Sequence, residues 1–198
     1  MILIACEESQ SICKAYREQG YEAYSCDILP CSGGHPEWHI QGDVLEHLER
    51  GWDLMIAHPP CTYLSVSGLH WNKRNPERAQ KTEEALVFVR MLMNAPIVKI
   101  AIENPISCIS TCIRKPDQII QPYEFGEDAS KKTCFWLKNL PKLQPTKYIE
   151  PRFIDGKPRW SNQTDSGQNK LGPSEDRSAI RSKTYQGIAN AIAEQWKP

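Results

Sequence analysis

The sequence of 198 residues has no apolar run long enough to cross a membrane. Its first residues, Met1 to Ala5, also lack the basic start of a secretory signal peptide. Both absences argue against a membrane protein and against a secreted one. We therefore expect a cytoplasmic protein whose eight cysteines are reduced thiols and not disulfide partners.

The sequence also lacks net charge, since 24 Lys and Arg residues balance 24 Asp and Glu residues. The charges are unevenly distributed, however. Residues 1–130 hold 11 basic and 18 acidic residues, a net charge of −7, whereas residues 131–183 hold 12 and 5, a net charge of +7. This asymmetry suits an acidic part that holds a cationic cofactor beside a basic segment that meets phosphates. A solvated and partly flexible surface is the alternative interpretation.

No internal repeat or low-complexity tract is present, and the length and the hydrophobic content of 40% suit one globular domain with a full core. Apolar runs alternate with helical patterns. We expect strands at residues 2–5, 21–26, 52–57, 98–102 and 133–137. A first helix, capped by Ser9 or Ser11, should end at Gly20, and a second should begin at Pro76. The alternation predicts an α/β fold with a parallel sheet.

Residues 138–181 break this alternation, because proline, glycine, asparagine and serine are dense there and apolar residues are sparse. The segment predicts a long loop or a minimal subdomain. A terminal helix is then expected from Ser182 to Ala193. We therefore divide the chain into a main domain, residues 1–137 with 182–198, and a loop-rich basic segment, residues 138–181.

A thiol and a carboxylate follow two of the expected strands. Pro59, Pro60 and Cys61 come shortly after the strand at 52–57, and Glu103 and Asn104 come directly after the strand at 98–102. Parallel α/β sheets bind their ligands at the carboxyl ends of the strands. We therefore expect Cys61 and Glu103 to lie at one site, although a cysteine buried by chance behind a proline turn is the plainer alternative.

The pairing of Pro-Pro-Cys with Glu-Asn resembles the catalytic centre of the C5-cytosine methyltransferases. The resemblance implies a Rossmann-like sheet with helices on both faces and S-adenosylmethionine as the cofactor. It also implies that Cys61 is a covalent nucleophile and that Glu103 holds the base. A compact member of this family further implies a bacteriophage or prophage setting.

Other positions carry the resemblance further along the chain. Asp27 ends the second strand, where the family holds the cofactor ribose, and Asp43 matches an acid that accepts from the adenine amino group. Asn190, near the start of the terminal helix, matches a further cofactor motif, and Pro59 borders the cofactor as well. The resemblance therefore assigns Asp27, Asp43, Pro59 and Asn190 to cofactor binding.

Three departures from the family pattern are evident. The first turn, Ala5 to Gln10, contains no glycine, and Glu7 there would bind the cofactor's ammonium group but repel its carboxylate. Lys131 and Lys132 stand where the family has an arginine motif, Lys132 as a catalytic and Lys131 as a substrate-binding substitute, although lysine cannot reproduce a bidentate guanidinium. A short segment replaces the family's target-recognition domain, so a partner protein is a possible source of recognition.

The resemblance implies a mechanism in which a Cys61 thiolate attacks C6 of cytosine and thereby activates C5. Pro60, Tyr63, Ser65 and Asn104 would contact the substrate. For Asn104 we favour the alternative role of orienting Glu103 and its loop. In a duplex the base must flip out to reach the thiol. DNA is the expected substrate. One alternative is that the chain acts on RNA or on a free pyrimidine nucleotide. Another is that it is a non-catalytic protein that binds DNA or the cofactor.

One other cluster is chemically able to bind zinc. Cys26, Cys31, His35 and His39 are spaced as Cys-x4-Cys-x3-His-x3-His. Cys26 lies in an expected strand, however, and glycines and a proline nearby indicate an ordinary loop. We therefore assign no metal, and we expect this loop to border the adenine, where Trp38 or a histidine would stack.

Overall fold

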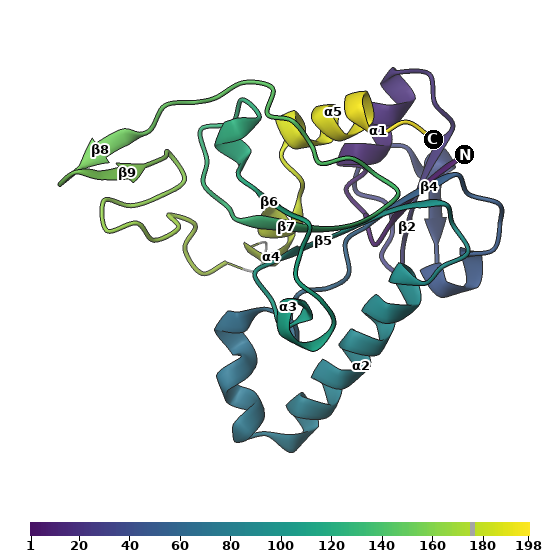
Figure 1. The fold of residues 1–198 in the computed structure, drawn as a ribbon, viewed down its shortest axis with the longest axis horizontal. Helices are drawn as coiled ribbons and strands as arrows, with labels where there is room; N and C mark the ends of the chain where they lie inside the picture. Colours follow the sequence, from purple (N-terminus) through teal and green to yellow (C-terminus); the bar gives the residue numbers. More distant parts are fainter. Residues whose placement is uncertain (175–176) are drawn as a thin grey trace.

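The computed structural model describes residues 1–174 and 177–198, and the side chains of these residues except 178 and 179. A sheet of seven strands runs through its centre in the order β3-β2-β1-β4-β5-β7-β6 (Figure 1). The strands are β1 (Ile2–Ala5), β2 (Ala23–Asp27), β3 (His39–Gln41), β4 (Leu54–Ala57), β5 (Lys99–Pro105), β6 (Gln118–Ile120) and β7 (Thr133–Lys138). The predicted strands are therefore confirmed, with shifts of a few residues at their ends.

The two innermost strands explain why the sheet forms where it does. All four side chains of β1 and all four of β4 are buried. Such continuous apolar runs are typical of strands that are covered on both faces. They pair in parallel, with Ala5 opposite Ala57. Because both strands end at the same level, the residues that come after Ala5 and Ala57 meet at one edge of the sheet.

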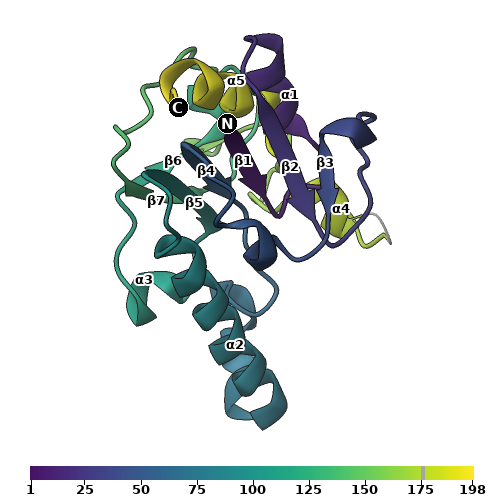
Figure 2. The ribbon, with the colours of Figure 1, turned by 90° about the vertical axis from the view of Figure 1, so that its right-hand side faces the viewer.

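Helices cover both faces of this sheet, as Figures 1 and 2 show. They are α1 (Ser11–Glu18), α2 (Pro76–Met93), α3 (Ile109–Cys112), α4 (Arg177–Ser182) and α5 (Gln186–Gln195). Helices α1 and α5 pack together over one face, where Ile12, Tyr16, Ile188 and Ile192 are buried. Helix α2 covers the other face with Leu86, Val89 and Leu92. The fold is thus the predicted Rossmann-like α/β sheet with helices on both faces.

Four short 3-10 helices complete the regular structure. They are η1 (Pro36–Trp38), η2 (Val44–His47), η3 (Val66–Lys73) and η4 (Pro122–Glu124). Together with α2, η3 forms an arm that extends away from the sheet below it in Figure 1. Helix α2 begins at Pro76, as predicted, and the side chain of Asn75 accepts a hydrogen bond from the Arg78 N–H.

The predicted parallel pairing holds for β1 to β5 but not at the edge of the sheet that β6 and β7 form. Strand β7 pairs antiparallel with β5 on one side and with β6 on the other. A parallel neighbour for β5 would require a long crossover, usually through a helix. After β5 the chain instead forms the short helix α3, adds β6 at the edge and returns through η4 to β7 between them. The sequence pattern of β7 indicates its burial but not its direction.

The predicted starts of two helices are also wrong. Neither Ser9 nor Ser11 caps α1, because the capping position belongs to Gln10, which has a left-handed backbone with φ of 57°. The side chain of Glu7 instead accepts a hydrogen bond from the first turn. The terminal helix begins at Gln186, and Ser182 ends the separate helix α4.

Residues between β7 and α4 form the two-stranded sheet of β8 (Arg152–Ile154) and β9 (Lys157–Arg159), which extends away from the main sheet in Figure 1. Trp160 fastens this segment by stacking on Tyr123 at 4.1 Å between ring centroids. Ser161 adds a hydrogen bond from its N–H to Oδ1 of Asp128. The division into a main domain and a basic segment at 138–181 stays a prediction.

All eight cysteines are free thiols. Within the described part of the chain, no helix combines the length and the apolar character needed to span a membrane.

Candidate active site

The thiol and the carboxylate predicted to act together lie at the carboxyl ends of two neighbouring strands, Cys61 beyond the end of β4 and Glu103 within the last residues of β5. Strand β4 ends at Ala57, and His58, Pro59, Pro60 and Cys61 follow it. Strand β5 pairs in parallel with β4, and Ile102, the partner of Ala57, directly precedes Glu103. Both groups therefore lie at the carboxyl end of the parallel strands, where such sheets bind their ligands.

Hydrogen bonds hold the Pro-Pro-Cys turn in place. The carbonyl of Cys61 accepts from the N–H groups of Leu64 at 3.1 Å and Ser65 at 2.9 Å, and Leu64 is fully buried. On the preceding side, Nδ2 of the buried Asn104 donates to the carbonyl of Pro59 at 2.8 Å. The Asn104 side chain therefore joins β5 to the turn that presents the thiol.

Cys61 itself is exposed, yet the structure does not favour its thiolate. Partial burial raises its pKa most, and the charge of Glu103 raises it further. A hydrogen bond from the backbone and the charges of Lys131 and Arg181 lower the pKa but do not outweigh these effects. Cys61 is therefore a thiol at neutral pH.

Glu103 forms a pair with a histidine that the sequence analysis did not single out. Nδ1 of His58 lies 2.9 Å from Oε2 of Glu103, and the two side chains are 12% and 16% exposed. Burial alone would raise the pKa of Glu103. The hydrogen bond and charge of His58, together with the charge of Lys131, outweigh burial and hold that pKa below its usual value. Glu103 is therefore a carboxylate at neutral pH.

The structure brings Lys131, and not Lys132, to this pair. Lys131 lowers the pKa of both Glu103 and Cys61, and its Nζ donates to the carbonyl of Arg181 at 2.7 Å. Lys132 is exposed, and its charge acts on Cys134 of β7, where it only partly opposes the rise in pKa that burial and Glu103 cause. Neighbouring residues of an extended chain point to opposite sides, so only one of the two lysines faces the pair.

A small cavity lies beside these groups, between the sheet and the start of α5. Polar side chains of His58, Glu103, Lys131, Thr133 and Tyr185 line it, together with apolar residues of β7 and α5. Cys61 does not line the cavity but is close enough for Glu103 to act on its pKa. The arrangement places a thiol, a carboxylate and an ammonium group around one region.

Two acids lie farther along the same edge of the sheet. Asp27 ends β2, and Asp43 follows β3; the Gly42 N–H ties the two together by donating to the carbonyl of Asp27 at 2.9 Å. Both acids act on Cys6: burial raises the pKa of its thiol most, and the charges of Asp27 and Asp43 raise it further. Each carboxylate uses Oδ1 to accept a backbone N–H, from Leu29 and Leu45 respectively.

Glu7 is turned into the protein. Its carboxylate accepts from the N–H of Ile12 at 2.7 Å and from that of Cys13 at 3.3 Å, and the residue is only 5% exposed. Burial raises the pKa of Glu7, and the charge of His58 and these two hydrogen bonds oppose that effect. Glu7 thus occupies the first turn of α1, where an anionic ligand would otherwise find unpaired N–H groups.

The remaining predicted site residues are dispersed. Asn190 is exposed on α5 and accepts from Nε2 of Gln186 at 2.7 Å. Tyr63 lies under the side chains of Arg78 and Lys81, at 5.0 and 5.7 Å from its ring centroid. Ser65 pairs with Ser67 at 3.1 Å between hydroxyl oxygens, and Pro60 is exposed beside Cys61. Pro60, Tyr63 and Ser65 belong to the turn around Cys61, whose carbonyl accepts from the Ser65 N–H, and Asn190 belongs to another part of the molecule.

The four residues with zinc-like spacing have separate partners. Cys26 Sγ lies 3.7 Å from the carbonyl of Gly42, and Cys31 Sγ lies 2.9 Å from Oε1 of Gln10. His35 bonds to Glu37, and His39 bonds to Ser25. Across residues 1–174 and 177–198, no group of three or more His, Cys, Asp or Glu side chains is arranged to hold a metal ion.

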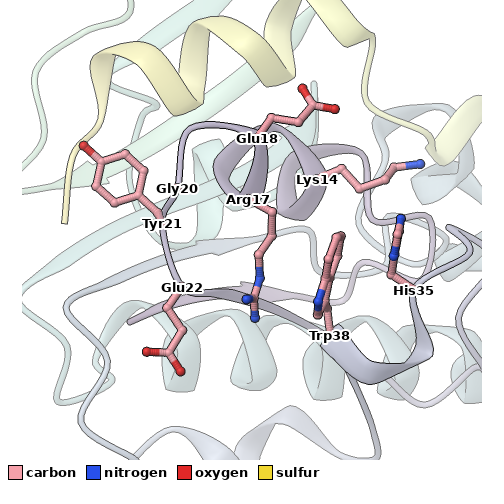
Figure 3. Close-up of a pocket in the computed structure, with 8 residues that line it drawn as sticks. All are labelled: Lys14, Arg17, Glu18, Gly20, Tyr21, Glu22, His35 and Trp38. Atoms are coloured by element: carbon pink, nitrogen blue, oxygen red, sulfur yellow. The ribbon is translucent and has the colours of Figure 1, made fainter.

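A larger hollow of about 550 Å³ lies elsewhere, between α1, the start of β2 and η1 (Figure 3). Trp38 lies there between the ring of His35, stacked at 3.8 Å, and the guanidinium of Arg17 at 5.1 Å. Trp38 precedes β3, whereas Asp27 is at the carboxyl end of β2. The stacking of Trp38 or a histidine on an adenine stays a prediction, and the residues that line this hollow are different from those that line the cavity beside Glu103.

His58 is the functional candidate that the sequence analysis missed. Its position directly before Pro-Pro-Cys is a signal, because that residue lies at the end of a parallel strand. A histidine there has many possible partners, however, and nothing local identifies Glu103, 45 positions away, as the actual one.

No protein-family model matches the sequence, and no curated protein matches it. Among solved structures, one similar chain is described as a candidate DNA modification methyltransferase encoded within a prophage of E. coli, with 12% identity and a TM-score of 0.45. The alignment covers 78% of this chain and 53% of that one. Another is a mutant of DNMT2 from Spodoptera frugiperda, with 16% identity, a TM-score of 0.45 and coverage of 80% and 56%. This chain thus spans little more than half of either protein, and the comparisons assign it no activity.

Proposed function

We propose that this chain transfers a methyl group from S-adenosylmethionine to C5 of cytosine in DNA, with Cys61 as the covalent nucleophile. One observation carries the proposal: Cys61 comes after β4, Glu103 lies near the end of the neighbouring parallel strand β5, and Glu103 and Lys131 are close enough to act on the Cys61 thiol. A thiol, a carboxylate and an ammonium group around one region are the groups that this chemistry requires.

The residues at the sheet edge fit the nucleoside part of the proposed cofactor. Asp27 and Asp43 each keep one carboxylate oxygen beyond the backbone bond made by Oδ1, and such oxygens accept from hydroxyl and amino groups. Ile28 and Leu29, directly after Asp27, are 74% and 55% exposed and offer apolar contact to a ring. When bound, S-adenosylmethionine supplies an electrophilic methyl group.

The methionine part of the cofactor fits less simply. Glu7 already occupies the N–H groups of the first turn of α1, so a carboxylate there would face another carboxylate. We therefore assign no methionine contact to this turn, and Glu7 is better explained as an internal cap of α1.

The roles of the chain's own groups depend on their charges. The proton of the exposed Cys61 thiol passes to water, and the thiolate forms a bond to C6 of the pyrimidine, which pushes negative charge onto the ring. After C5 has taken the methyl group, loss of the C5 proton to water and departure of the sulfur from C6 would restore the ring and the free cysteine. Glu103, a carboxylate, accepts an N–H of the exocyclic amine and so fixes the orientation of the ring. Lys131 provides the positive charge nearest this pair, which offsets the charge that develops on the ring.

DNA is the proposed substrate because the segment at 138–181 is rich in basic residues and extends from the edge of the molecule. Arg152, Lys157 and Arg159 lie on its hairpin, and Phe153 there is 65% exposed. Cations beside an exposed aromatic ring are typical of surfaces that bind nucleic acids. In this proposal the segment takes the place of a target-recognition domain.

The test is methyl transfer from labelled S-adenosylmethionine to DNA, RNA and free cytidine nucleotides by the wild type and the Cys61→Ser variant. We expect label in DNA from the wild type and none from the variant, because a hydroxyl is too weak a nucleophile at neutral pH. A DNA containing 5-fluorocytosine should also form a covalent adduct with the wild type alone.

Cys112→Ser is the matched control, since Cys112 is also an exposed cysteine but lies on α3. It should methylate DNA like the wild type. Transfer to RNA or to nucleotides alone would change the substrate in the proposal. Unchanged turnover in Cys61→Ser would exclude the nucleophile, and the failure of a calorimetric titration to detect S-adenosylmethionine binding would exclude the enzyme altogether.

A further inference from the structure

We propose that His58 is a positioning residue that holds Glu103 ionised and in one orientation, with Oε2 bound to the imidazole and Oε1 directed to the substrate. The proposal rests on the function proposed for Glu103 and adds to it the residue through which that carboxylate is controlled. Four features of the pair support it: the hydrogen bond, the way His58 is fixed, the surrounding charges and the free ring nitrogen.

The direction of the hydrogen bond is set by chemistry. An ionised carboxylate only accepts hydrogen bonds, so Nδ1 of His58 must carry the hydrogen that lies between it and Oε2 of Glu103, 2.9 Å away. This bond uses one of the two carboxylate oxygens. We assign the other oxygen, Oε1, to the substrate.

The backbone of His58 is fixed independently of its side chain. Its N–H donates to the carbonyl of Ala5 at 2.9 Å, which continues the pairing of β1 with β4 by one residue. Pro59 comes immediately after it and restricts the backbone further. The imidazole is 12% exposed, so it has little freedom to leave Glu103. A group held in this way is suited to orient another.

The charges around the imidazole favour this arrangement. Two acids, Glu103 and Glu7, are close to His58. Burial raises the pKa of each, and the charge of His58 opposes that effect in both. Lys131 acts on Glu103 as well, and Glu103 acts on Cys61. Glu103 thus depends on His58 and Lys131 to remain ionised despite its burial. Of these, His58 is the one that contacts it directly.

The second ring nitrogen indicates that the imidazole belongs to the site. Nε2 of His58 is buried and has no hydrogen-bond partner among the residues that the structure describes. Buried polar atoms are normally paired, so an unpaired one needs an explanation such as a ligand that it would bind. Since His58 lines the same cavity as Glu103 and Lys131, its position serves ligand chemistry as well as packing.

Asparagine, leucine and glutamine at position 58 separate these contributions. The side-chain nitrogen of asparagine, Nδ2, is bonded to Cγ, as Nδ1 of histidine is. The side-chain nitrogen of glutamine, Nε2, lies one bond farther from the backbone. His58→Asn therefore keeps the donor to Glu103, His58→Gln displaces it, and His58→Leu removes it while it fills much of the space. His58→Gln also guards against poor folding of the leucine variant.

The decisive measurement is the carboxyl titration of Glu103 by NMR on protein labelled with ¹³C at glutamate Cδ, assigned with Glu103→Gln. We expect a midpoint below the usual range of glutamate in the wild type. In His58→Asn, which keeps the donor but loses the charge of the imidazole, the midpoint should lie above that of the wild type and below that of the other two variants. Without the donor, burial is the largest remaining effect, so the midpoint should rise above that range in His58→Gln and His58→Leu. A residue with a merely structural role would leave the midpoint where it is.

Turnover provides the second readout. Methyl transfer by His58→Asn should stay within about threefold of the wild type, and kcat should fall about ten- to a hundredfold in His58→Gln and His58→Leu, which lose a hydrogen bond to a charged group. The acidic limb of their pH profiles should move to higher pH. An unchanged Glu103 midpoint in both loss variants would overturn the proposal.

The two proposals fail separately. The titration requires no substrate, so it tests His58 even if the chain transfers no methyl group. A raised midpoint in the loss variants, together with full turnover in Cys61→Ser, would refute the proposed nucleophile and leave the control of Glu103 by His58 intact.

Discussion

Nδ1 of His58 and Oε2 of Glu103 lie 2.9 Å apart, although 45 positions separate the two residues. The contact joins the ends of two parallel strands and leaves Glu103 ionised in a buried place. It also raises the pKa of the neighbouring Cys61, because a charged carboxylate opposes a second negative charge. The site therefore contains a permanent negative charge on Glu103, and Cys61 must lose its proton in the presence of that charge.

The raised pKa of Cys61 predicts slow alkylation at neutral pH that accelerates as the pH rises, because only the thiolate reacts. Glu103→Gln removes a negative charge and should speed alkylation by iodoacetamide at pH 8 roughly two- to fivefold, whereas Lys131→Met removes a positive charge and should slow it by a similar factor. Mass spectrometry of the Cys61 peptide measures both rates, with the exposed Cys112 as an internal reference. Slower alkylation in Glu103→Gln would contradict the charge arrangement.

Asn104→Ala should destabilise the fold by about 1 to 3 kcal/mol, because it leaves the buried Pro59 carbonyl without its donor. Asn94→Ala is the matched control: Asn94 makes a bond of the same length, 2.8 Å, to the carbonyl of Arg90, but it is exposed to water. Urea unfolding compares the two variants. Equal losses would show that burial of the Asn104 bond has no special weight.

Gly187→Ala should also destabilise the protein. A Cβ atom there would lie 1.9 Å from the carbonyl oxygen of Phe125, which is backbone and cannot move aside cheaply. We expect a loss of about 2 to 3 kcal/mol from this overpacking, although alanine favours a helix over glycine. Gly172→Ala, where a Cβ would meet nothing within 4 Å, should be nearly neutral in the same urea experiment. A stabilised Gly187→Ala would contradict the close approach of α5 to Phe125.

Glu7 should make the stability of the fold depend on pH. Its pKa is raised in the folded chain, so its contribution is complete below the usual pKa of glutamate and declines as the pH rises through the raised folded value. Glu7→Gln removes this dependence, although it weakens the cap of α1 at Cys13. The free energy of unfolding, measured with urea at several pH values between 4 and 8, should decline less with pH in Glu7→Gln than in the wild type. Parallel curves would show that Glu7 is not the group responsible.

The main elements of the fold were predictable from local patterns. The apolar runs of β1 and β4 and the helical spacing of α2 reflect burial within a single segment, and that information is contained in the segment itself. The direction of β7 was not predictable, because a buried strand reads the same whether its neighbour runs parallel or antiparallel. The cap of α1 was also missed, since Glu7 reaches the helix from outside the usual capping position.

The candidate site divides in the same way. The order of residues along the chain predicts that Cys61 and Glu103 come after neighbouring strands, because the residues beyond the carboxyl ends of parallel strands lie at one edge of the sheet. That Lys131 faces the pair and Lys132 does not depends on how β7 is aligned beside β5. The partner of His58 depends on the alignment of β5 beside β4.

The sequence by itself determined which segments are buried, where the strands end and which reactive residues lie beyond those ends. Only the tertiary structure decided that His58 binds Glu103, that Glu7 turns inward to α1 and that the thiol of Cys61 lies in the field of a carboxylate. Burial and helical or strand periodicity are properties of neighbouring residues. Hydrogen bonds and charge effects between distant segments depend on packing and strand register, which no single segment encodes.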